Sequence, residues 1–367
     1  MILQGLESSF PHDIMTPMQE SIDRTQFLSS FSKTHSAKSI IDQLGKLKSM
    51  KILVIGEAII DEYHYTTPMG KSSKEPLVVH RYTREESYAG GALATVNHTA
   101  ALSDNVTLVT LLGKSPSHEP FIRSHLKKTI KSKFFFREGS TIIKRRYIDL
   151  EANQKLFQVS FIWNDVISPA IEKIIAAYFK REIPKYDLVM VNDFGHGFLT
   201  PKLIRLIARK AKLLAINVQA NSANYGFNIV TKYPRADIAT TDIHEIRLAT
   251  HDRYGDVLKL ARSVARHLHS QTLIVTRGSH GSTGYNKEKG FVDVPALTDI
   301  IIDRVGAGDA LYSVIAPCLA MGMDLSTALF VGNAAAAIKI QTVGNKTPIT
   351  LDDLKGFISK LLKLLAS

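Results

Sequence analysis

Short apolar runs rich in β-branched residues recur along the chain, and they predict strands that are buried on both faces. These runs cover residues 52–55, 106–112, 188–191, 213–218 and 272–276. Between them, apolar residues recur at the spacing of an amphipathic helix. The helices expected from this spacing cover residues 169–181, 200–212, 255–269, 307–321 and 325–341. Because strands and helices alternate, we predict an α/β fold with a doubly wound, mostly parallel sheet flanked by helices.

Two segments interrupt this alternation. Residues 76–82 and 141–161 are rich in Val, Ile, Tyr and Phe, and no helix separates them from the β-like segments before them. Their polar and apolar side chains alternate, which is typical of a half-exposed strand. We therefore predict a small antiparallel sheet, a β lid at about residues 65–85 and 141–161, that projects from the main domain.

The N-terminal segment has a different pattern. Residues 21–31 and 37–47 are amphipathic helix candidates separated by Ser and Thr. We interpret residues 1–50 as an appended helical arm and residues 51–367 as one α/β domain that includes the lid.

The composition excludes several classes of protein. Of the 367 residues, 45% are hydrophobic and 22% are charged, which excludes a disordered, collagen-like or coiled-coil chain. The single cysteine, Cys318, can form neither an internal disulfide nor a multi-cysteine zinc site, as is typical of a reducing cytoplasm. No apolar run approaches the ~20 residues of a membrane span, and the first residues do not resemble a signal peptide. We expect a cytoplasmic protein without a membrane partner.

The net charge of +12 is concentrated in one stretch. Between Arg123 and Arg146, nine basic residues oppose one acidic residue, Glu138, which gives a formal charge of +8. Such a stretch either binds an anionic partner or forms a solvated basic face. The phenylalanines at 134–136 within it favour a buried strand over a base-stacking surface, so nucleic acid is not an expected partner.

The strongest local signal is Gly306-Ala307-Gly308-Asp309, which opens a long apolar helix. Two glycines around a small residue let backbone N–H groups approach an anion at a helix N-terminus. A carboxylate in the first turn, Asp309, can act there as the base for an attacking hydroxyl group. The alternative is that the glycines only shape a turn and Asp309 only caps the helix.

Other phosphate-binding and nucleophile motifs fail. Gly70-Lys71-Ser72 resembles the end of a Walker A loop, but Tyr65 stands where the first glycine is required. The third glycine of a dinucleotide fingerprint is replaced by Leu311. A serine-hydrolase elbow fails at residues 278–281.

Residues 303–309, Asp-Arg-Val-Gly-Ala-Gly-Asp, resemble the C-terminal signature of the ribokinase-like (PfkB) family of carbohydrate kinases. Residues 51–61, 89–92 and 275–281 resemble three further motifs of that family and follow in the same order. Within the family, residues 70–76 and 191–197 look most like the heptose-phosphate kinase part of the ADP-heptose synthesis enzymes.

The resemblance implies an ATP-dependent kinase that transfers the γ-phosphoryl group to a hydroxyl of a sugar or sugar phosphate, with a heptose phosphate as one candidate. It implies Asp309 as the base and the amides of Gly306, Ala307 and Gly308 as the groups that stabilise charge. The implied sugar contacts are Asp61, Gly90, Gly91, Asp193 and Asn97. The implied nucleotide contacts are Thr276, Arg277, Gly278, Gly281, Asn333 and Asn217, and the implied metal ligands are Asp242 and Glu245.

The same resemblance implies ATP and Mg²⁺ as cofactors, leaves open a monovalent cation such as K⁺, and implies a homodimer joined through the lid. Several residues depart from the family pattern. Ala94 and Thr95 stand where the family has a sugar-binding Asn, which makes Asn97 the next candidate. Where the heptose kinases have Asp-Pro-Lys, residues 217–219 are Asn-Val-Gln. The identity of the sugar therefore stays open.

Strand alternation puts Lys144 and Arg146 on one face of the lid. If that face is turned toward the sugar, the two cations could hold a phosphate that the sugar already carries. Alternatively, they are solvated lid residues or dimer contacts. Two other functions also remain open at this point. One is a non-catalytic, kinase-like binding or regulatory protein, and the other is a kinase for a neutral sugar or a nucleoside.

Overall fold

The computed structural model describes residues 22–163 and 165–363. Among these residues, the main sheet has nine strands. In spatial order they are β13 (Gly290–Val294), β12 (Ser282–Asn286), β11 (Thr272–Thr276), β10 (Ile238–Asp242), β9 (Leu213–Val218), β8 (Leu188–Asp193), β1 (Lys51–Gly56), β4 (Asn105–Gly113) and β5 (Lys131–Arg137). The strands from β11 to β5 pair in parallel, and β12 and β13 pair antiparallel at one edge. The predicted doubly wound, mostly parallel sheet is confirmed.

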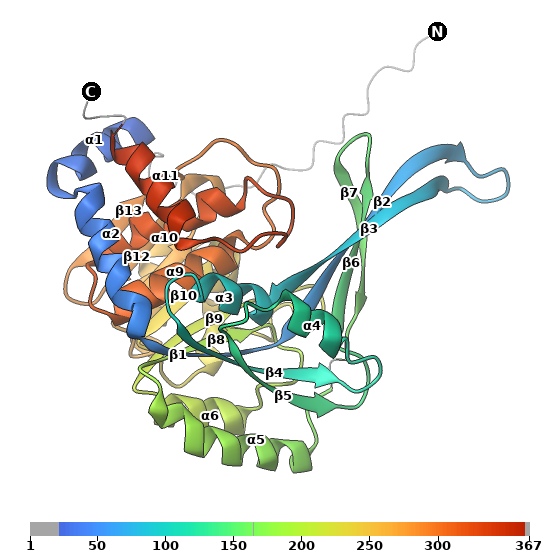
Figure 1. Ribbon diagram of the computed structural model, residues 1–367, viewed down its shortest axis with the longest axis horizontal. Helices are drawn as coiled ribbons and strands as arrows, with labels where there is room; N and C mark the ends of the chain where they lie inside the picture. Colours follow the sequence, from blue (N-terminus) through green and yellow to red (C-terminus); the bar gives the residue numbers. More distant parts are fainter. Residues whose placement is uncertain (1–21, 164, 364–367) are drawn as a thin grey trace, which may run out of the picture.

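Helices cover both faces of this sheet (Figure 1). One layer contains α1 (Arg24–Thr34), α2 (Ala37–Gly45), α3 (Ala92–Thr99), α4 (Glu119–His125), α9 (Ala307–Ala320), α10 (Leu325–Lys339) and α11 (Leu351–Lys363). The other layer contains α5 (Pro169–Glu182), α6 (Pro201–Lys210), α7 (Ile243–Thr250) and α8 (Val257–His267). Strand β1 shows why both faces must be covered. Ile52 and Val54 pack into the first layer, whereas Leu53 and Ile55 pack into the second.

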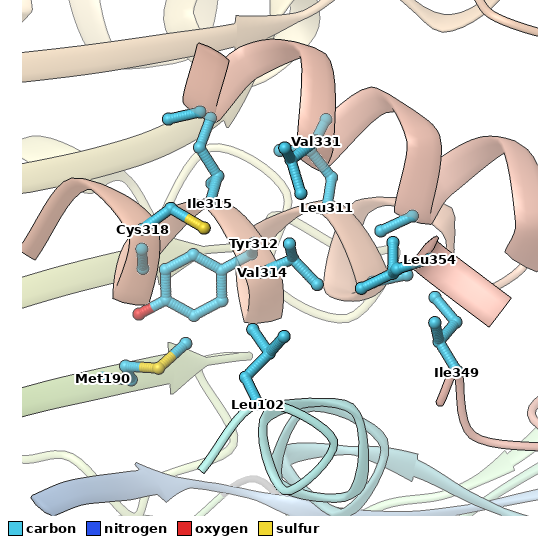
Figure 2. Close-up of a cluster of buried hydrophobic side chains, with 14 of the residues drawn as sticks. Leu102, Met190, Leu311, Tyr312, Val314, Ile315, Cys318, Val331, Ile349 and Leu354 are labelled. Carbon is cyan, nitrogen blue, oxygen red and sulfur yellow. The ribbon is translucent and has the colours of Figure 1, made fainter. Parts of the chain in front are cut away.

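Helix α9 lies in the centre of the first layer (Figure 2). Its side chain Tyr312 lies near Met190 of β8, Cys318 follows on the same helix, and Leu311 lies near Val331 of α10. All five side chains are buried. Because α9 is held on both sides by apolar packing, the position of its N-terminus, where Asp309 lies, is fixed relative to the sheet.

The helices of the N-terminal arm pack on the same core as the rest of the first layer. Leu28 and Phe31 of α1 and Ile40 of α2 are buried in it, and the rings of Phe31 and Phe330 lie 4.5 Å apart. A 3₁₀-helix, Lys46–Ser49, joins α2 to β1. The sequence predicted both helices. Residues 1–21 of the predicted arm lie outside the described residues.

A second, small sheet projects from the body of the protein (Figure 1). Its order is β3 (Val78–Gly91), β2 (Ala58–Lys71), β6 (Ile142–Asp149) and β7 (Gln154–Phe161). The outer pairings, β2 with β3 and β6 with β7, are antiparallel, and the central pairing of β2 with β6 is parallel. The predicted small sheet is therefore present, and β2 and β3 extend it to the edge of the main sheet.

Candidate active site

The parallel strands end at one edge of the main sheet, and the first turn of α9 faces the same edge. A cleft of about 320 Å³ opens there. It is lined by Asn217, Gln219, Ala220, Thr240, Thr241, Asp242, Glu245, Thr276, Arg304, Gly306, Gly308 and Asp309. Ligands of open α/β sheets bind beyond the carboxyl ends of the strands. The cleft thus combines seven residues that the sequence singled out for three different roles, namely catalysis, nucleotide binding and metal binding.

The Gly306 turn starts α9 and depends on the absence of a side chain. Gly306 has a φ of 84°, and a Cβ atom added to it would lie 2.4 Å from Oδ1 of Asn345. Ala307 and Gly308 are the first two residues of the helix that follows. The first N–H groups of a helix have no partner within the helix, so this turn can offer them to an anion in the cleft.

Asp309 lies in the first turn of α9 with only 8% of its surface exposed. Its Oδ1 accepts a hydrogen bond of 3.0 Å from Nε2 of Gln219. Longer contacts of 3.4 and 3.5 Å come from the side-chain amides of Asn192 and Asn217. Burial, together with the negative charge of Asp61, raises the pKa of Asp309 to about 7. A carboxylate with this pKa is suited to accept a proton near neutral pH.

Asp61 lies on β2, at the junction of the lid and the main sheet, and is 4% exposed. Its Oδ1 forms an ion pair of 2.6 Å with Nη1 of Arg146 on β6. A Cβ atom added to Gly90 would lie 2.1 Å from Oδ2 of Asp61, so only glycine leaves room for this carboxylate. Gly91, with a φ of 57°, turns the chain from β3 into α3. The structure therefore brings Asp61 and Gly90, two residues that the resemblance implied as sugar contacts, together with Arg146 of the lid.

Lys144 and Arg146 lie on the same face of β6. The ammonium group of Lys144 lies 5.5 Å from the ring centre of Phe194. Burial lowers the pKa of Lys144, while Asp61 and Asp309 act in the opposite direction. The charge of Lys144 therefore lies close to both carboxylates. The guanidinium group of Arg145 forms an ion pair of 2.7 Å with Glu62 and lies over the ring of Phe161.

Asp242 and Glu245 form a capping box at the start of α7. Oδ1 of Asp242 accepts from the backbone N–H of Glu245 at 2.7 Å, and Oε2 of Glu245 accepts from that of Asp242 at 3.0 Å. Burial and the charge of Asp242 raise the pKa of Glu245 to about 8. Two carboxyl groups held this close in a polar cleft repel one another when both are ionised, and a bound cation relieves that repulsion.

The predicted nucleotide segment follows β11. Thr276 lines the cleft. Arg277 is held by Asp293 at 3.3 Å and by the carbonyl of His280 at 3.2 Å, which closes a tight turn. Gly278 and Gly281 have φ angles of 58° and 82° in that turn. The turn lies next to the part of the cleft formed by Thr276, and Asp242 pairs with Thr276 in the sheet.

Three predicted contact residues are engaged by the protein itself. The side-chain amide of Asn97 bonds the backbone of His125 and Lys127, at 2.8 and 3.0 Å. Asn333 donates to Ser282 Oγ at 2.6 Å and to the carbonyl of Leu329. These hydrogen bonds hold loops and strands in place, so we do not include Asn97 or Asn333 among the ligand contacts proposed below.

Asp193 is the third of these residues and is completely buried. Its Oδ2 lies 2.7 Å from both the ammonium of Lys232 and the hydroxyl of Tyr233, and its Oδ1 accepts from the N–H of Gly195. Glu57 accepts from the backbone of Phe194 and His196 in the same loop. Burial and the charge of Asp193 raise the pKa of Glu57. Asp193 and Glu57 thus shape the loop that carries Phe194, and Asp193 is not included as a sugar contact.

The basic stretch between Arg123 and Arg146 does not form one basic surface. Its basic residues are divided among α4, the loop after it and β5 of the main domain, and β6 of the lid. Arg137 is buried and donates to the carbonyls of Asp165 and His196. Arg123 pairs with Glu119 at 2.6 Å. The prediction of a buried strand at Phe134–136 is confirmed by β5.

Sequence reasoning did not assign a role to several residues at the site. Gln219, Lys339 and Asn345 were missed because each is a single polar residue without a motif of its own. Only the fold brings them next to Asp309, the Gly306 turn and Asp61. A position directly after a predicted strand, as at Gln219, is the one signal that could have pointed to a site residue.

The comparison with known proteins agrees with this geometry. Residues 49–351 match the sequence family described as pfkB family carbohydrate kinase. The chain belongs to this family. The pfkB match spans the main sheet, the lid and the Gly306 turn, and the resemblance inferred from residues 51–61, 89–92, 275–281 and 303–309 is confirmed.

Among the pfkB relatives, Bifunctional protein HldE of Citrifermentans bemidjiense is 27% identical over 302 residues. The match covers 82% of this chain and 61% of that protein, so the chain spans about three fifths of the length of this relative. Bifunctional protein HldE of Nitrobacter hamburgensis is also 27% identical, over 311 residues, which are 83% of this chain and 62% of that protein.

Solved structures confirm the ribokinase-like fold of this pfkB protein. Ribokinase from Thermotoga maritima has a TM-score of 0.65 at 17% identity, covering 84% of this chain and 99% of that chain. Phosphofructokinase-2 from Escherichia coli, in complex with substrates and products, has a TM-score of 0.69 at 13% identity, covering 85% of this chain and 99% of that chain. Within residues 22–163 and 165–363, we find no helix with the length and apolar character needed to cross a bilayer.

Proposed function

We propose that this pfkB protein is an ATP-dependent kinase that transfers the γ-phosphoryl group to a hydroxyl of a sugar phosphate. The observation that carries this proposal is the position of Asp309. It is a buried carboxylate with a pKa of about 7, and it lies next to a helix N-terminus that suits an anion. The negative charge of a second carboxylate, Asp61, acts on it. A base, an anion site and a polar acceptor site in one cleft are the parts that phosphoryl transfer requires.

In the proposed reaction, Asp309 accepts the proton of the acceptor hydroxyl as its oxygen attacks the γ-phosphorus, and ADP leaves from the opposite side. The N–H groups of the Gly306 turn, with Ala307 and Gly308, stabilise the charge of the transferring group. Asp61, fixed by Arg146 and Gly90, orients the sugar by accepting hydrogen bonds from its hydroxyl groups. Thr276, Asn217 and the turn with Arg277, Gly278 and Gly281 border the proposed nucleotide site.

Asp242 and Glu245 are the residues that we propose for Mg²⁺. Their oxygen atoms and their mutual repulsion suit a hard divalent cation. In the part of the chain that the structure describes, no cluster of three His, Cys, Asp or Glu side chains could hold a metal ion. The remaining ligands would therefore come from phosphate oxygens and water. Bound there, Mg²⁺ would neutralise part of the phosphate charge.

The acceptor is proposed to carry a phosphate because Lys144 is a partly buried cation beside the acceptor site. Within the described residues it has no ion pair, whereas Arg146 is paired with Asp61. Phosphate binds a desolvated ammonium group well. A heptose phosphate is the first candidate acceptor, since the chain resembles the heptose-phosphate kinase part of ADP-heptose synthesis enzymes and its relatives carry the name Bifunctional protein HldE.

We also propose that the chain forms a homodimer through its lid. Exposed apolar side chains gather on the projecting strands, among them Met69, Val79, Phe157, Val159 and Phe161. The lid extends away from the body (Figure 1), and among the described residues these side chains remain exposed. A second copy would present the same strip and bury it symmetrically. A buried single thiol at Cys318 agrees with a proposed cytoplasmic location.

The test is acceptor-dependent formation of ADP. The purified protein is assayed with ATP, Mg²⁺ and a panel of neutral sugars and nucleosides, together with sugar phosphates that include seven-carbon sugars. The proposal predicts turnover with at least one sugar phosphate. A protein that binds nucleotide and sugar without any turnover would instead be a binding or regulatory protein.

A further inference from the structure

Lys339 is a buried lysine that the proposed reaction does not use. It is the last residue of α10 and is 1% exposed. Its ammonium group donates to the carbonyl oxygen of Gly344 and to Oγ1 of Thr342, the latter at 3.3 Å. Lysine is almost never fully buried unless a partner compensates its charge. The position therefore calls for a reason beyond packing.

Three carboxylates surround this lysine without touching it. Burial lowers the pKa of Lys339, and the negative charges of Asp303, Asp61 and Asp309 act against that effect. Neutral carbonyl and hydroxyl oxygens in contact, with carboxylates farther out, form an environment that also suits a monovalent cation such as K⁺ or ammonium. Lys339 places its own ammonium group in such an environment.

Gly344 connects Lys339 to the start of the phosphate-binding segment. The N–H of Gly344 donates to Oδ2 of Asp303 at 2.9 Å, while its carbonyl accepts from Lys339. Gly344 has a φ of 48°, and a Cβ atom there would lie 2.7 Å from the ring of Tyr88. Asp303 in turn accepts from the N–H of Val305 at 3.1 Å, three residues before Gly308.

Lys339 also lies directly against the Gly306 turn. A Cβ atom added to Gly306 would lie 3.3 Å from Cε of Lys339. The backbone on either side is tied together, because Ile302 and Asp303 both donate to the carbonyl of Ile340, at 2.8 and 3.1 Å. The ammonium group of Lys339, the Gly306 turn and Asp303 are therefore connected by hydrogen bonds and direct packing at the N-terminus of α9.

We propose that Lys339 is a built-in cation that positions the Gly306 turn for phosphoryl transfer, so that the enzyme requires no added monovalent cation. This inference rests on the proposed kinase function. Lys339 is a positioning residue, since it acts on the transferring phosphate through the turn and through its charge. The lysine supplies in every molecule the charge that a dissociable ion would supply only when bound.

The experiment compares the wild type with Lys339→Ala, which leaves a space for a small cation, and Lys339→Met, which fills that space with an uncharged chain. Lys346→Ala is the matched control, because Lys346 belongs to the same segment but its side chain is 62% exposed. Turnover is measured with K⁺, ammonium or Na⁺ against tetramethylammonium at constant ionic strength. Tetramethylammonium is too large to enter the space.

We expect the wild type and Lys346→Ala to change by less than about twofold on addition of K⁺ or ammonium. Lys339→Ala should lose about 10²-fold in kcat, as is usual when one charge-stabilising group at a reacting centre is removed, and K⁺ or ammonium should restore most of it. Lys339→Met should lose as much without restoration. A wild type that depends strongly on K⁺ would overturn the inference, as would a folded Lys339→Ala variant with unchanged kcat or without restoration by any cation.

Thermal melting provides a second readout that does not depend on turnover. K⁺ or ammonium should raise the melting temperature of Lys339→Ala but not of the wild type or of Lys339→Met. If Lys339→Ala folds only when ammonium is present, that result also supports a cation role. An equal response of all three proteins would refute a cation role. If instead no acceptor is turned over by any variant while the melting pattern holds, the kinase proposal fails and the cation site stands.

Discussion

Nε2 of Gln219 lies 3.0 Å from Oδ1 of Asp309. The donor is neutral, so it orients the carboxylate without the large decrease in pKa that a contacting cation would cause. Burial and the charge of Asp61 therefore dominate, and the pKa of Asp309 rises to about 7. This relationship lets a carboxylate act as a base at neutral pH rather than remain a weak, fully ionised acceptor.

The pH dependence of catalysis follows from that pKa. Below about pH 7 Asp309 holds a proton and cannot accept another, so kcat/KM should fall as the pH decreases through this value. Gln219→Leu removes a hydrogen bond that lowers the pKa of Asp309. In this variant the decrease of kcat/KM on the acidic side of the pH profile, its acidic limb, should therefore occur at higher pH. Initial rates across the pH range measure both. An acidic limb that stays in place in Gln219→Leu would mean that another group controls it.

The same buried charge affects stability. The folded-state pKa of Asp309 is about 7, above the ordinary value of 3.8, so ionisation destabilises the folded state as the pH rises from about 4, with the full penalty above about 7. Asp309→Asn should therefore increase the free energy of unfolding at pH 8 by up to about 4 kcal/mol, and by little at pH 4. Urea unfolding at the two pH values measures the difference. A variant that is less stable than the wild type at pH 8 would contradict this.

The acceptor phosphate is tested on β6. Lys144→Met should decrease kcat/KM for a sugar phosphate by about 10- to 100-fold, because one charge-assisted hydrogen bond is lost, and should change the value for the corresponding neutral sugar much less. Arg146→Ala should decrease kcat/KM for both the sugar phosphate and the neutral sugar, since it leaves the buried Asp61 without its partner. Arg145→Ala is the control, because Arg145 pairs with Glu62. Equal losses for both sugars in Lys144→Met would exclude a phosphate contact.

Assembly is tested on the exposed strip of the lid. Phe157→Ser combined with Val159→Ser should convert the proposed dimer to a monomer, because it removes apolar area that the second copy would bury. Phe227→Ser is the matched control, since Phe227 is 89% exposed and lies outside the lid. Light scattering gives the mass of each protein. A wild type that is monomeric at micromolar concentration would refute the dimer.

The main-sheet strands that the sequence predicted from continuous apolar runs have helices on both faces. Ile52–Ile55 in β1 has four apolar residues in succession for this reason. Strand β10 was missed because Thr240, Thr241 and Asp242 make it polar where it borders the cleft. Strand β2 was predicted only in part, since Asp61, Glu62 and His64 interrupt its apolar residues and find their partners across the lid.

The site shows a similar limit. Asp309 and the Gly306 turn could be found because glycines and a carboxylate at a helix start leave a local pattern. Asn97 and Asp193 were assigned to the sugar by resemblance, and only the folded chain shows that Asn97 holds the backbone at 125–127 and that Asp193 pairs with Lys232. Lys339 stands 36 positions after Asp303 in an apolar helix, and nothing in the local sequence relates the two.

The central claim is that Asp309 assists direct transfer of the γ-phosphoryl group to a sugar phosphate. The most direct measurement follows a label from the γ-phosphate of ATP into the acceptor at pH 8, for the wild type and for Asp309→Asn. We predict a labelled sugar bisphosphate with the wild type and a rate about 10²- to 10⁴-fold lower with Asp309→Asn, although that variant still binds ATP. Label that appears only in free phosphate, or transfer at an unchanged rate in the variant, would contradict this account.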